Sequence, residues 1–179
     1  MSDDGDASLV RDCLAGDARA FEQLLVRYQR PVYNAALRIL GNREDAKDVT
    51  QTVFLNAYQH LGRFDTGQRF FSWLYRIAVN ETLDAAAARK PLEPLPETLV
   101  EAGVRPDEAV SQEQLDAGMQ AALLALKLEY RTVLVLRHVQ GLGYEEIGAI
   151  LDCPPKTVKS RLHTALEALR QVLADRGLV

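Results

Sequence analysis

The chain has 179 residues, 47% hydrophobic and 26% charged, an ordinary composition for a soluble globular protein of one compact domain or two small ones. Its 21 basic and 25 acidic residues give a net charge of −4, whereas proteins that hold DNA unaided are usually basic. The acidic N-terminus lacks the apolar run of a signal peptide, and no apolar stretch approaches the roughly 20 residues that cross a membrane, so we expect a cytoplasmic protein.

Nearly every long segment has the apolar period of a helix, and no run of β-branched residues alternates over strand length, so the sequence predicts an all-α protein. A first helix is expected over about 7–15, ended by Gly16 in a left-handed conformation. Asp17 is suited to cap a second helix, residues 18–40. Pro31 lies inside this second pattern and is expected to kink or split the helix.

Asn42 is suited to cap a third helix, about 43–62. One face of this helix carries the residues expected in the core, namely Ala46, Thr50, Val53, Ala57 and Leu61. The opposite face mixes one apolar residue with acidic, amide and hydroxyl groups, namely Asp48, Gln51, Thr52 and Leu55. A merely solvated face usually carries more lysine and glutamate, so we interpret this face as a protein-docking surface.

A fourth helix, about 68–88, follows the loop sequence FDTGQR, and five aromatic residues lie within the twelve positions 64–75. Aromatic rings with interleaved arginines suit single-stranded nucleic acid, because bases stack on rings and phosphates meet guanidinium groups. The alternative is that most rings are core, which we expect for Phe70 and part of Trp73. The stripe expected to be buried comprises Phe70, Leu74, Ile77 and Ala78. The opposite face comprises Ser72, Arg76, Val79 and Leu83, with Tyr75 and Asn80 at its margins.

Residues 91–108 hold four of the seven prolines, and residues 91–113 hold six acidic residues and one basic residue. Prolines and like charges keep a segment extended, which predicts an acidic linker between two small helical domains. The predicted boundaries are 1–90 for the first domain, 91–112 for the linker and 113–179 for the second domain. Because the first domain is neutral overall, the acidity of the chain comes largely from the linker.

The second domain is predicted to contain four short helices, the last two of which form a helix-turn-helix motif. Gly143 can begin a helix at Tyr144, and the sequence DCPP ends it, since Pro154 and Pro155 cannot continue it. Pro155 instead suits the first turn of the last helix. Gly148 is small at a point where a second helix could cross closely.

Apolar residues recur along the last helix at intervals of four and three and form its expected buried stripe: Val158, Leu162, Ala165, Leu169 and Val172. The remaining surface carries groups that donate to phosphates or base edges: Lys156, Thr157, Lys159, Ser160, Arg161, His163 and Thr164. An ordinary solvated face is the alternative, but the helix-turn-helix context favours contact with DNA. Residues 127–176 carry a net charge of +2, in contrast to the acidic whole.

Common enzyme motifs are missing from the sequence: there is no GxGxxG, no HExxH, no GxSxG and no glycine-rich phosphate-binding loop. Cys13 and Cys153 form no CxxC pair and have no histidine at ligand spacing, which predicts free thiols and no metal site. We therefore expect a protein that is not an enzyme and that uses no metal or cofactor.

Three segments in one order resemble bacterial sigma factors of the extracytoplasmic-function group, within the sigma-70 family. These segments are GNREDAKDVTQTVF, FSWLYRIAVN and YEEIGAILDCPPKTVKSRL. The resemblance covers about residues 7–90 and 113–175. Each motif alone is only suggestive, whereas three motifs in the expected order and separation are specific.

The resemblance implies that the first domain is a sigma-2 domain, which docks on core RNA polymerase and opens the promoter −10 element. It implies that the second is a sigma-4 domain, which reads the −35 element, and that the polymerase is contacted at its β′ clamp and β flap. The docking face then comprises Asp48, Gln51, Thr52 and Leu55. The −10 surface comprises Phe64, Arg69, Ser72, Trp73, Arg76 and Asn80. The −35 surface comprises Thr157, Lys159, Ser160, Arg161, His163 and Thr164.

Regulation also follows from the resemblance. Sigma factors of this group respond to stress or envelope signals and are commonly held inactive by an anti-sigma factor, often a membrane protein. The acidic linker matches a segment that runs through polymerase toward the RNA exit path. Because polymerase supplies most of the electrostatic grip on DNA, the subunit itself can be acidic and basic only where it reads DNA.

The chain departs from the family pattern at several positions. Four alanines, 85–88, end the fourth helix where a basic cluster is usual, and Thr52 replaces a usual acidic residue. Asp152 replaces a usual turn glycine, although aspartate tolerates the left-handed conformation. The departures leave open a sigma-like mimic that binds a regulator and never directs transcription. A self-sufficient helix-turn-helix repressor is a further alternative, but we find no heptads that would form the required dimer.

Overall fold

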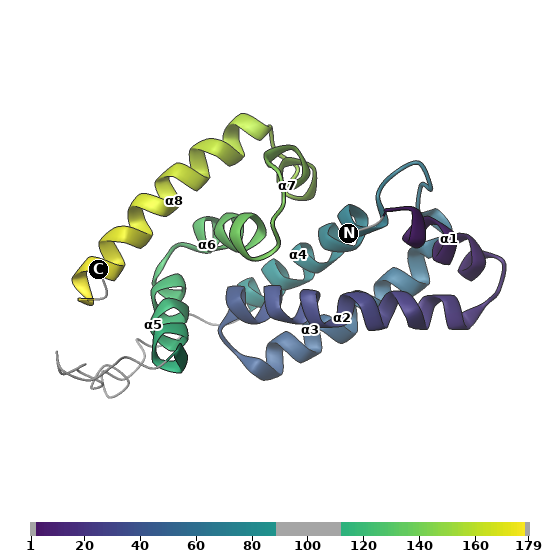
Figure 1. Ribbon diagram of the computed structural model, residues 1–179, viewed down its shortest axis with the longest axis horizontal. Helices are drawn as coiled ribbons and strands as arrows, with labels where there is room; N and C mark the ends of the chain where they lie inside the picture. Colours follow the sequence, from purple (N-terminus) through teal and green to yellow (C-terminus); the bar gives the residue numbers. More distant parts are fainter. Residues whose placement is uncertain (1–2, 89–111, 178–179) are drawn as a thin grey trace.

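A computed structural model describes residues 3–88 and 112–177, and in these ranges every regular element is helical, which confirms the all-α prediction. The N-terminal part contains α1 (Asp3–Leu14), α2 (Ala18–Leu40), α3 (Arg43–His60), the 3₁₀ turn η1 (Leu61–Arg63) and α4 (Phe70–Ala88). The C-terminal part contains α5 (Gln112–Ala125), α6 (Leu128–Leu134), the π-helical turn η3 (Val135–Val139), α7 (Tyr144–Ile150) and α8 (Pro155–Asp175). Figure 1 shows this order from purple to yellow.

The helix ends lie close to the predicted positions because their capping residues act locally. Gly16 has φ 101° after α1, and the Asp17 carboxylate accepts a hydrogen bond of 2.9 Å from the backbone N–H of Arg19. Gly41 ends α2 with φ 71°, and its N–H donates to the carbonyl of Leu37 at 2.8 Å. A Cβ at Gly41 would also lie 2.6 Å from the side chain of Leu124, so this turn requires glycine for two reasons.

Pro31 was expected to kink or split α2, and the helix runs unbroken through it, so the proline does not split the helix. A kink at Pro31 stays a prediction. Proline lacks the N–H that would bond to the carbonyl four residues earlier, and its ring crowds that carbonyl. Its neighbours Tyr28 and Val32 are each 1% exposed, and their burial holds both halves of the helix against the core. Tertiary packing thus offsets the local cost of proline.

Helix α1 begins at Asp3, earlier than the predicted residue 7. The reason is a tertiary contact: Asp6 is only 3% exposed, and its carboxylate accepts hydrogen bonds from the Arg27 guanidinium and the Tyr28 hydroxyl. A buried carboxylate needs such partners. The pairing therefore ties the start of α1 to the middle of α2.

The two helical parts pack directly against one another. Helix α7 contacts α4, and α5 contacts α2. The buried apolar residues of both parts form one continuous cluster, which includes Leu74 and Tyr75 from α4 and Ile147 from α7. The predicted linker, 91–112, lies almost entirely outside the described residues.

Candidate functional site

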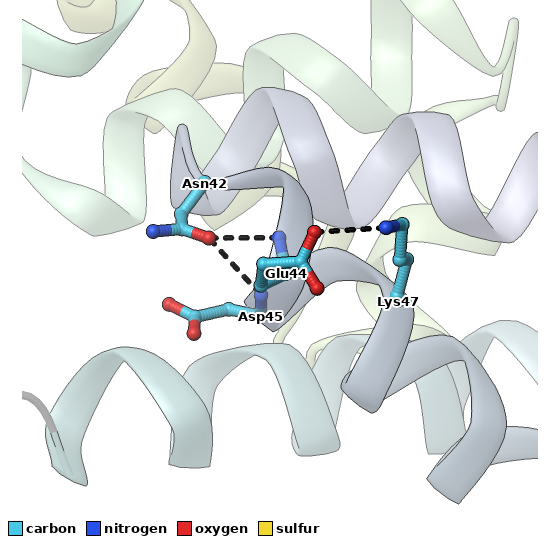
Figure 2. A network of polar contacts seen from close by, with 4 residues as sticks. All are labelled: Asn42, Glu44, Asp45 and Lys47. Carbon is cyan, nitrogen blue, oxygen red and sulfur yellow. Dashed lines mark hydrogen bonds and ion pairs between the residues drawn. The ribbon is translucent and has the colours of Figure 1, made fainter.

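The start of α3 is held by a short polar network around Asn42 (Figure 2). Its side-chain oxygen accepts hydrogen bonds from the backbone N–H groups of Glu44 at 2.8 Å and Asp45 at 3.1 Å, as the capping prediction requires. Lys47 pairs with Glu44 at 2.8 Å, and this hydrogen bond raises the pKa of Lys47. The cap sets where α3 begins and so which residues face outward.

Helix α3 divides into two faces largely as its sequence predicts. Ala46, Val53 and Ala57 are fully buried, whereas Thr50 is half-buried and donates its hydroxyl to the Ala46 carbonyl at 2.6 Å. All four residues of the docking face are exposed, and Leu55 is 57% exposed. A single exposed leucine is ordinary at a protein surface, so Leu55 by itself does not mark this face as a contact.

The sequence interpretation overlooked Tyr58, which follows Leu55 by one turn of α3. Its side chain is 55% exposed, although its ring also meets the edge of Phe21 at a centroid distance of 5.0 Å. The i, i+3 spacing from an exposed leucine was the available signal. Together Leu55 and Tyr58 extend the apolar part of the outer surface of α3.

The loop before α4 is shaped by Asp65. Its carboxylate accepts hydrogen bonds from the Gly67 N–H at 2.9 Å and from the Gln68 side chain at 3.3 Å. Beside the loop lies a cavity of about 210 Å³, lined by Phe64, loop residues 66–70 and two residues of α1, Ala7 and Val10. The contribution of α1 was not foreseen, because nothing local in the sequence places it there.

The aromatic rings around this loop form a mostly buried cluster. Phe64 and Phe70 are 8% and 2% exposed, which confirms the core interpretation of Phe70. Trp73 is half-buried, with its ring centroid 5.2 Å from Phe64 and 5.7 Å from Phe70. Among these three rings, Trp73 is therefore the one most accessible for stacking on a base, while the other two support it.

The outer face of α4 is less exposed than predicted. Arg76 and Asn80 are exposed and Ser72 is half-buried, but Val79 is 3% exposed and Tyr75 is fully buried. The expectation that Val79 lies on an open face was wrong, because α4 packs against α7 as well as against α2 and α3. The same environment raises the pKa of Tyr75 through burial.

Between α7 and α8 the chain makes the predicted tight turn. Asp152 has φ 50°, so the left-handed position usually given to glycine is occupied by aspartate. The N–H of Cys153 donates to the Gly148 carbonyl at 2.9 Å. A Cβ at Gly148 would lie 2.6 Å from the Cys153 carbonyl oxygen, so it is the turn backbone, not a crossing helix, that requires glycine here.

Helix α8 presents the predicted division of faces. Val158, Leu162 and Ala165 are buried, and Leu169 and Val172 are half-buried. The −35 surface is on the other side of the helix. Its exposed residues are Lys159, Ser160, His163 and Thr164, and its half-buried residues are Thr157 and Arg161.

Two residues of the −35 surface have acidic partners within the chain. Arg161 lies 3.7 Å from Glu129 of α6, and His163 lies 3.6 Å from Glu167. The first pair is partly exposed and the second is exposed, and ion pairs near the surface contribute little to stability.

Two arginines of the −10 surface contact α7. Arg69 donates to the Glu146 carboxylate at 2.5 Å, and Arg76 donates to the Ala149 carbonyl through Nε at 3.1 Å and Nη2 at 2.5 Å. The structure thus brings part of the −10 surface onto the helix-turn-helix motif, while the docking face and four of the six residues of the −35 surface are exposed.

Comparisons with known proteins identify both helical parts. Residues 24–91 match the model for sigma-70 region 2, and residues 117–169 match the model for sigma-70 region 4. Within the described ranges, no cluster of metal-ligating side chains occurs and no helix has the length and apolarity to cross a membrane.

Individual relatives cover nearly the whole chain. The extracytoplasmic-function sigma factor SigW of Bacillus subtilis is 37% identical over 93% of this chain and 95% of its own. The sigma-E factor of Escherichia coli is 35% identical over 92% of each chain. The solved structure of CnrH in complex with the cytosolic domain of CnrY superposes with a TM-score of 0.75 and 27% identity, covering 96% of this chain and 98% of that one.

Proposed function

The chain belongs to the extracytoplasmic-function group of the sigma-70 family, and from the exposure of its surfaces we propose how it acts as the promoter-recognition subunit of RNA polymerase. The observation that carries the proposal is that one chain holds a region 2 part with an exposed docking face and a region 4 helix-turn-helix with an exposed −35 surface. The protein is not an enzyme and directs the activity of one.

Docking on the polymerase uses the outer face of α3. Asp48 and Gln51 supply polar contacts to the β′ clamp, and Leu55 supplies an apolar anchor at the centre of the face. A polar rim around an exposed apolar residue is the usual composition of a protein interface. Region 4 supports the same complex through the β flap.

Recognition of the −10 element uses the loop before α4 and the outer face of that helix. In this proposal an unstacked base enters the cavity beside residues 66–70, Trp73 stacks on a neighbouring base, and Arg76 and Asn80 meet the backbone. The alanines at 85–88 provide no cation there, so we expect weak contact with the duplex beyond the −10 element.

Recognition of the −35 element uses α8 as the helix placed in the major groove. Ser160 and His163 are exposed one turn apart and suit base edges, whereas Lys159 is a flexible cation suited to phosphate. The turn geometry at Asp152 sets the angle between α7 and α8 and thus how α8 is presented.

Control by an anti-sigma factor is part of the proposal. The relative CnrH was solved with the cytosolic domain of CnrY, and we extend a partner of that kind to this chain. The protein acts in the cytoplasm together with polymerase, and its acidic linker, 91–112, competes with nucleic acid for basic channels of the enzyme.

The test is run-off transcription with purified core polymerase and a library of genomic promoter fragments. We expect specific transcripts that depend on the added protein. If no fragment gives a specific transcript while the protein binds a regulator tightly, it is a sigma-like mimic. Tight binding of a duplex by the protein alone at physiological salt would indicate a repressor.

A further inference from the structure

We infer that α1 forms one wall of the pocket that receives the unstacked −10 base, and that this wall selects a pyrimidine. The inference rests on the proposed −10 recognition and deepens it, because the pocket is the cavity of about 210 Å³ beside residues 66–70. It adds Ala7 and Val10 as residues that determine specificity, and Asp6 as the residue that positions them.

The cavity has an apolar side and a polar side. Ala7 and Val10 lie one turn apart on α1 and form the apolar side, which we call the α1 wall. Ala7 is exposed and Val10 is fully buried, so the wall reaches from solvent into the core. Thr66 and Gln68 of the loop are exposed and form the polar side. A base bound in the cavity therefore meets different chemistry on its two edges.

The loop presents hydrogen-bonding groups to a base. Asp65 accepts hydrogen bonds from the Gly67 N–H at 2.9 Å and from one N–H of the Gln68 amide at 3.3 Å. Among the described residues this is the one hydrogen bond of the amide, so its carbonyl oxygen and its second N–H can pair with the Watson–Crick edge of a base. The Thr66 hydroxyl can donate or accept at the same side.

The α1 wall favours a pyrimidine over a purine. On the edge that faces the major groove of a duplex, a purine carries the N7 acceptor, whereas a pyrimidine carries C5 with a hydrogen or, in thymine, a methyl group. Against Ala7 and Val10 the N7 atom would lose its hydrogen bond to water and gain none, and a buried unsatisfied acceptor is costly. The C5 edge of a pyrimidine has no such cost, and a thymine methyl gains apolar contact with the wall.

A buried carboxylate fixes the position of the α1 wall. Asp6 is 3% exposed and accepts hydrogen bonds from the Arg27 guanidinium and the Tyr28 hydroxyl. The Tyr28 ring lies 5.9 Å from the ring of Phe70, which lines the cavity. Helix α1 also contacts η1 and α4, the two elements that flank the loop. The pairing of Asp6 with α2 therefore holds the wall against the cavity.

The test uses the full chain assembled with core polymerase. Ala7→Leu fills the cavity with a larger apolar side chain, and its matched control is Ala18→Leu, the same exchange at an exposed position of α2 that does not line the cavity. Ala7→Gly removes the methyl group of the wall. Asp6→Asn removes the carboxylate charge that pairs with Arg27. The melting temperature of each variant is recorded beside its binding.

The probes are promoter fragments that give specific transcripts, prepared with the −10 non-template strand unpaired. Each base of that strand is replaced in turn by the other three. Each pyrimidine is also tested with and without its C5 methyl group, as thymine against uracil and as 5-methylcytosine against cytosine. The affinity of the holoenzyme for each probe is measured.

We expect the wild type and Ala18→Leu to prefer a pyrimidine by at least about fivefold at one −10 position, the factor expected for one lost hydrogen-bond partner. Ala7→Leu should reduce this preference to below about twofold and leave the other positions unchanged. Ala7→Gly should abolish the effect of the C5 methyl group at that position. Asp6→Asn should weaken the preference at the same position and at no other. Whether the wild type binds thymine or cytosine more tightly there identifies the base.

An unchanged base profile in both Ala7 variants, or a purine preference at the position that they alter, would overturn the inference. A uniform loss of affinity in Asp6→Asn with an unchanged profile would overturn the positioning role of Asp6. Failure of the proposed function is seen separately and earlier, because the wild type then gives no specific transcript from any fragment, and the inference falls with it.

Discussion

Replacement of Gly148 by alanine should destabilise the helix-turn-helix part and displace α8. The new Cβ would lie 2.6 Å from the Cys153 carbonyl oxygen, about 0.8 Å closer than ordinary van der Waals contact begins. That neighbour is backbone, and its N–H is already bonded to the Gly148 carbonyl, so the turn must move as a whole. Overpacking of this size costs about 1–3 kcal/mol.

Part of this cost is offset, because alanine is favoured over glycine in a helix by about 1 kcal/mol. We therefore expect a net loss of about 1 kcal/mol, which lowers the melting temperature of a chain of this size by about 2–4 °C. Because the turn orients α8, holoenzyme affinity for a −35 duplex should also fall, while affinity for core polymerase through α3 is retained.

The assays are thermal unfolding followed by circular dichroism, and binding of holoenzyme to promoter DNA. The control is Gly62→Ala, where a Cβ meets nothing within 4 Å and the melting temperature should not fall. If Gly148→Ala melts no lower than the wild type and binds −35 DNA equally well, the turn does not constrain α8 as argued.

Three further predictions concern the other surfaces. Asp48→Arg and Gln51→Ala should weaken binding to labelled core polymerase, by about 2–5 kcal/mol for the charge reversal, and should leave the melting temperature unchanged. If both variants bind core polymerase as tightly as the wild type does, the assignment of the docking face is refuted. Ser160→Ala and His163→Ala should each lose about 1–3 kcal/mol of discrimination at one or two −35 positions, and an unchanged base-preference profile would mean that α8 grips only the backbone. Burial raises the pKa of Tyr75 in the folded protein, so above about pH 10 the tyrosine of the unfolded protein loses its proton first and the free energy of unfolding falls. In denaturant titrations between about pH 9 and 11, Tyr75→Phe should therefore lose less stability than the wild type, and an equal loss in both proteins would contradict this.

Local features of the sequence predicted most of the helices and the outward faces. Asp17 and Asn42 cap helices with their own side chains, and Pro155 opens α8, as expected. The apolar period placed Val53 and Val158 in the core. These signals act over a few residues, so they can be read without knowledge of the fold.

The tertiary structure decided which predicted surfaces are covered. Val79 was expected on an open face and is buried, α2 continues through Pro31, and α1 is extended by the pairing of Asp6 with α2. The contact of Arg76 with the Ala149 carbonyl joins residues 73 positions apart. A periodic pattern tells which side of a helix is apolar, but not whether another part of the chain lies against its polar side. That depends on how two separately formed helical parts meet, which no short-range signal in the sequence encodes.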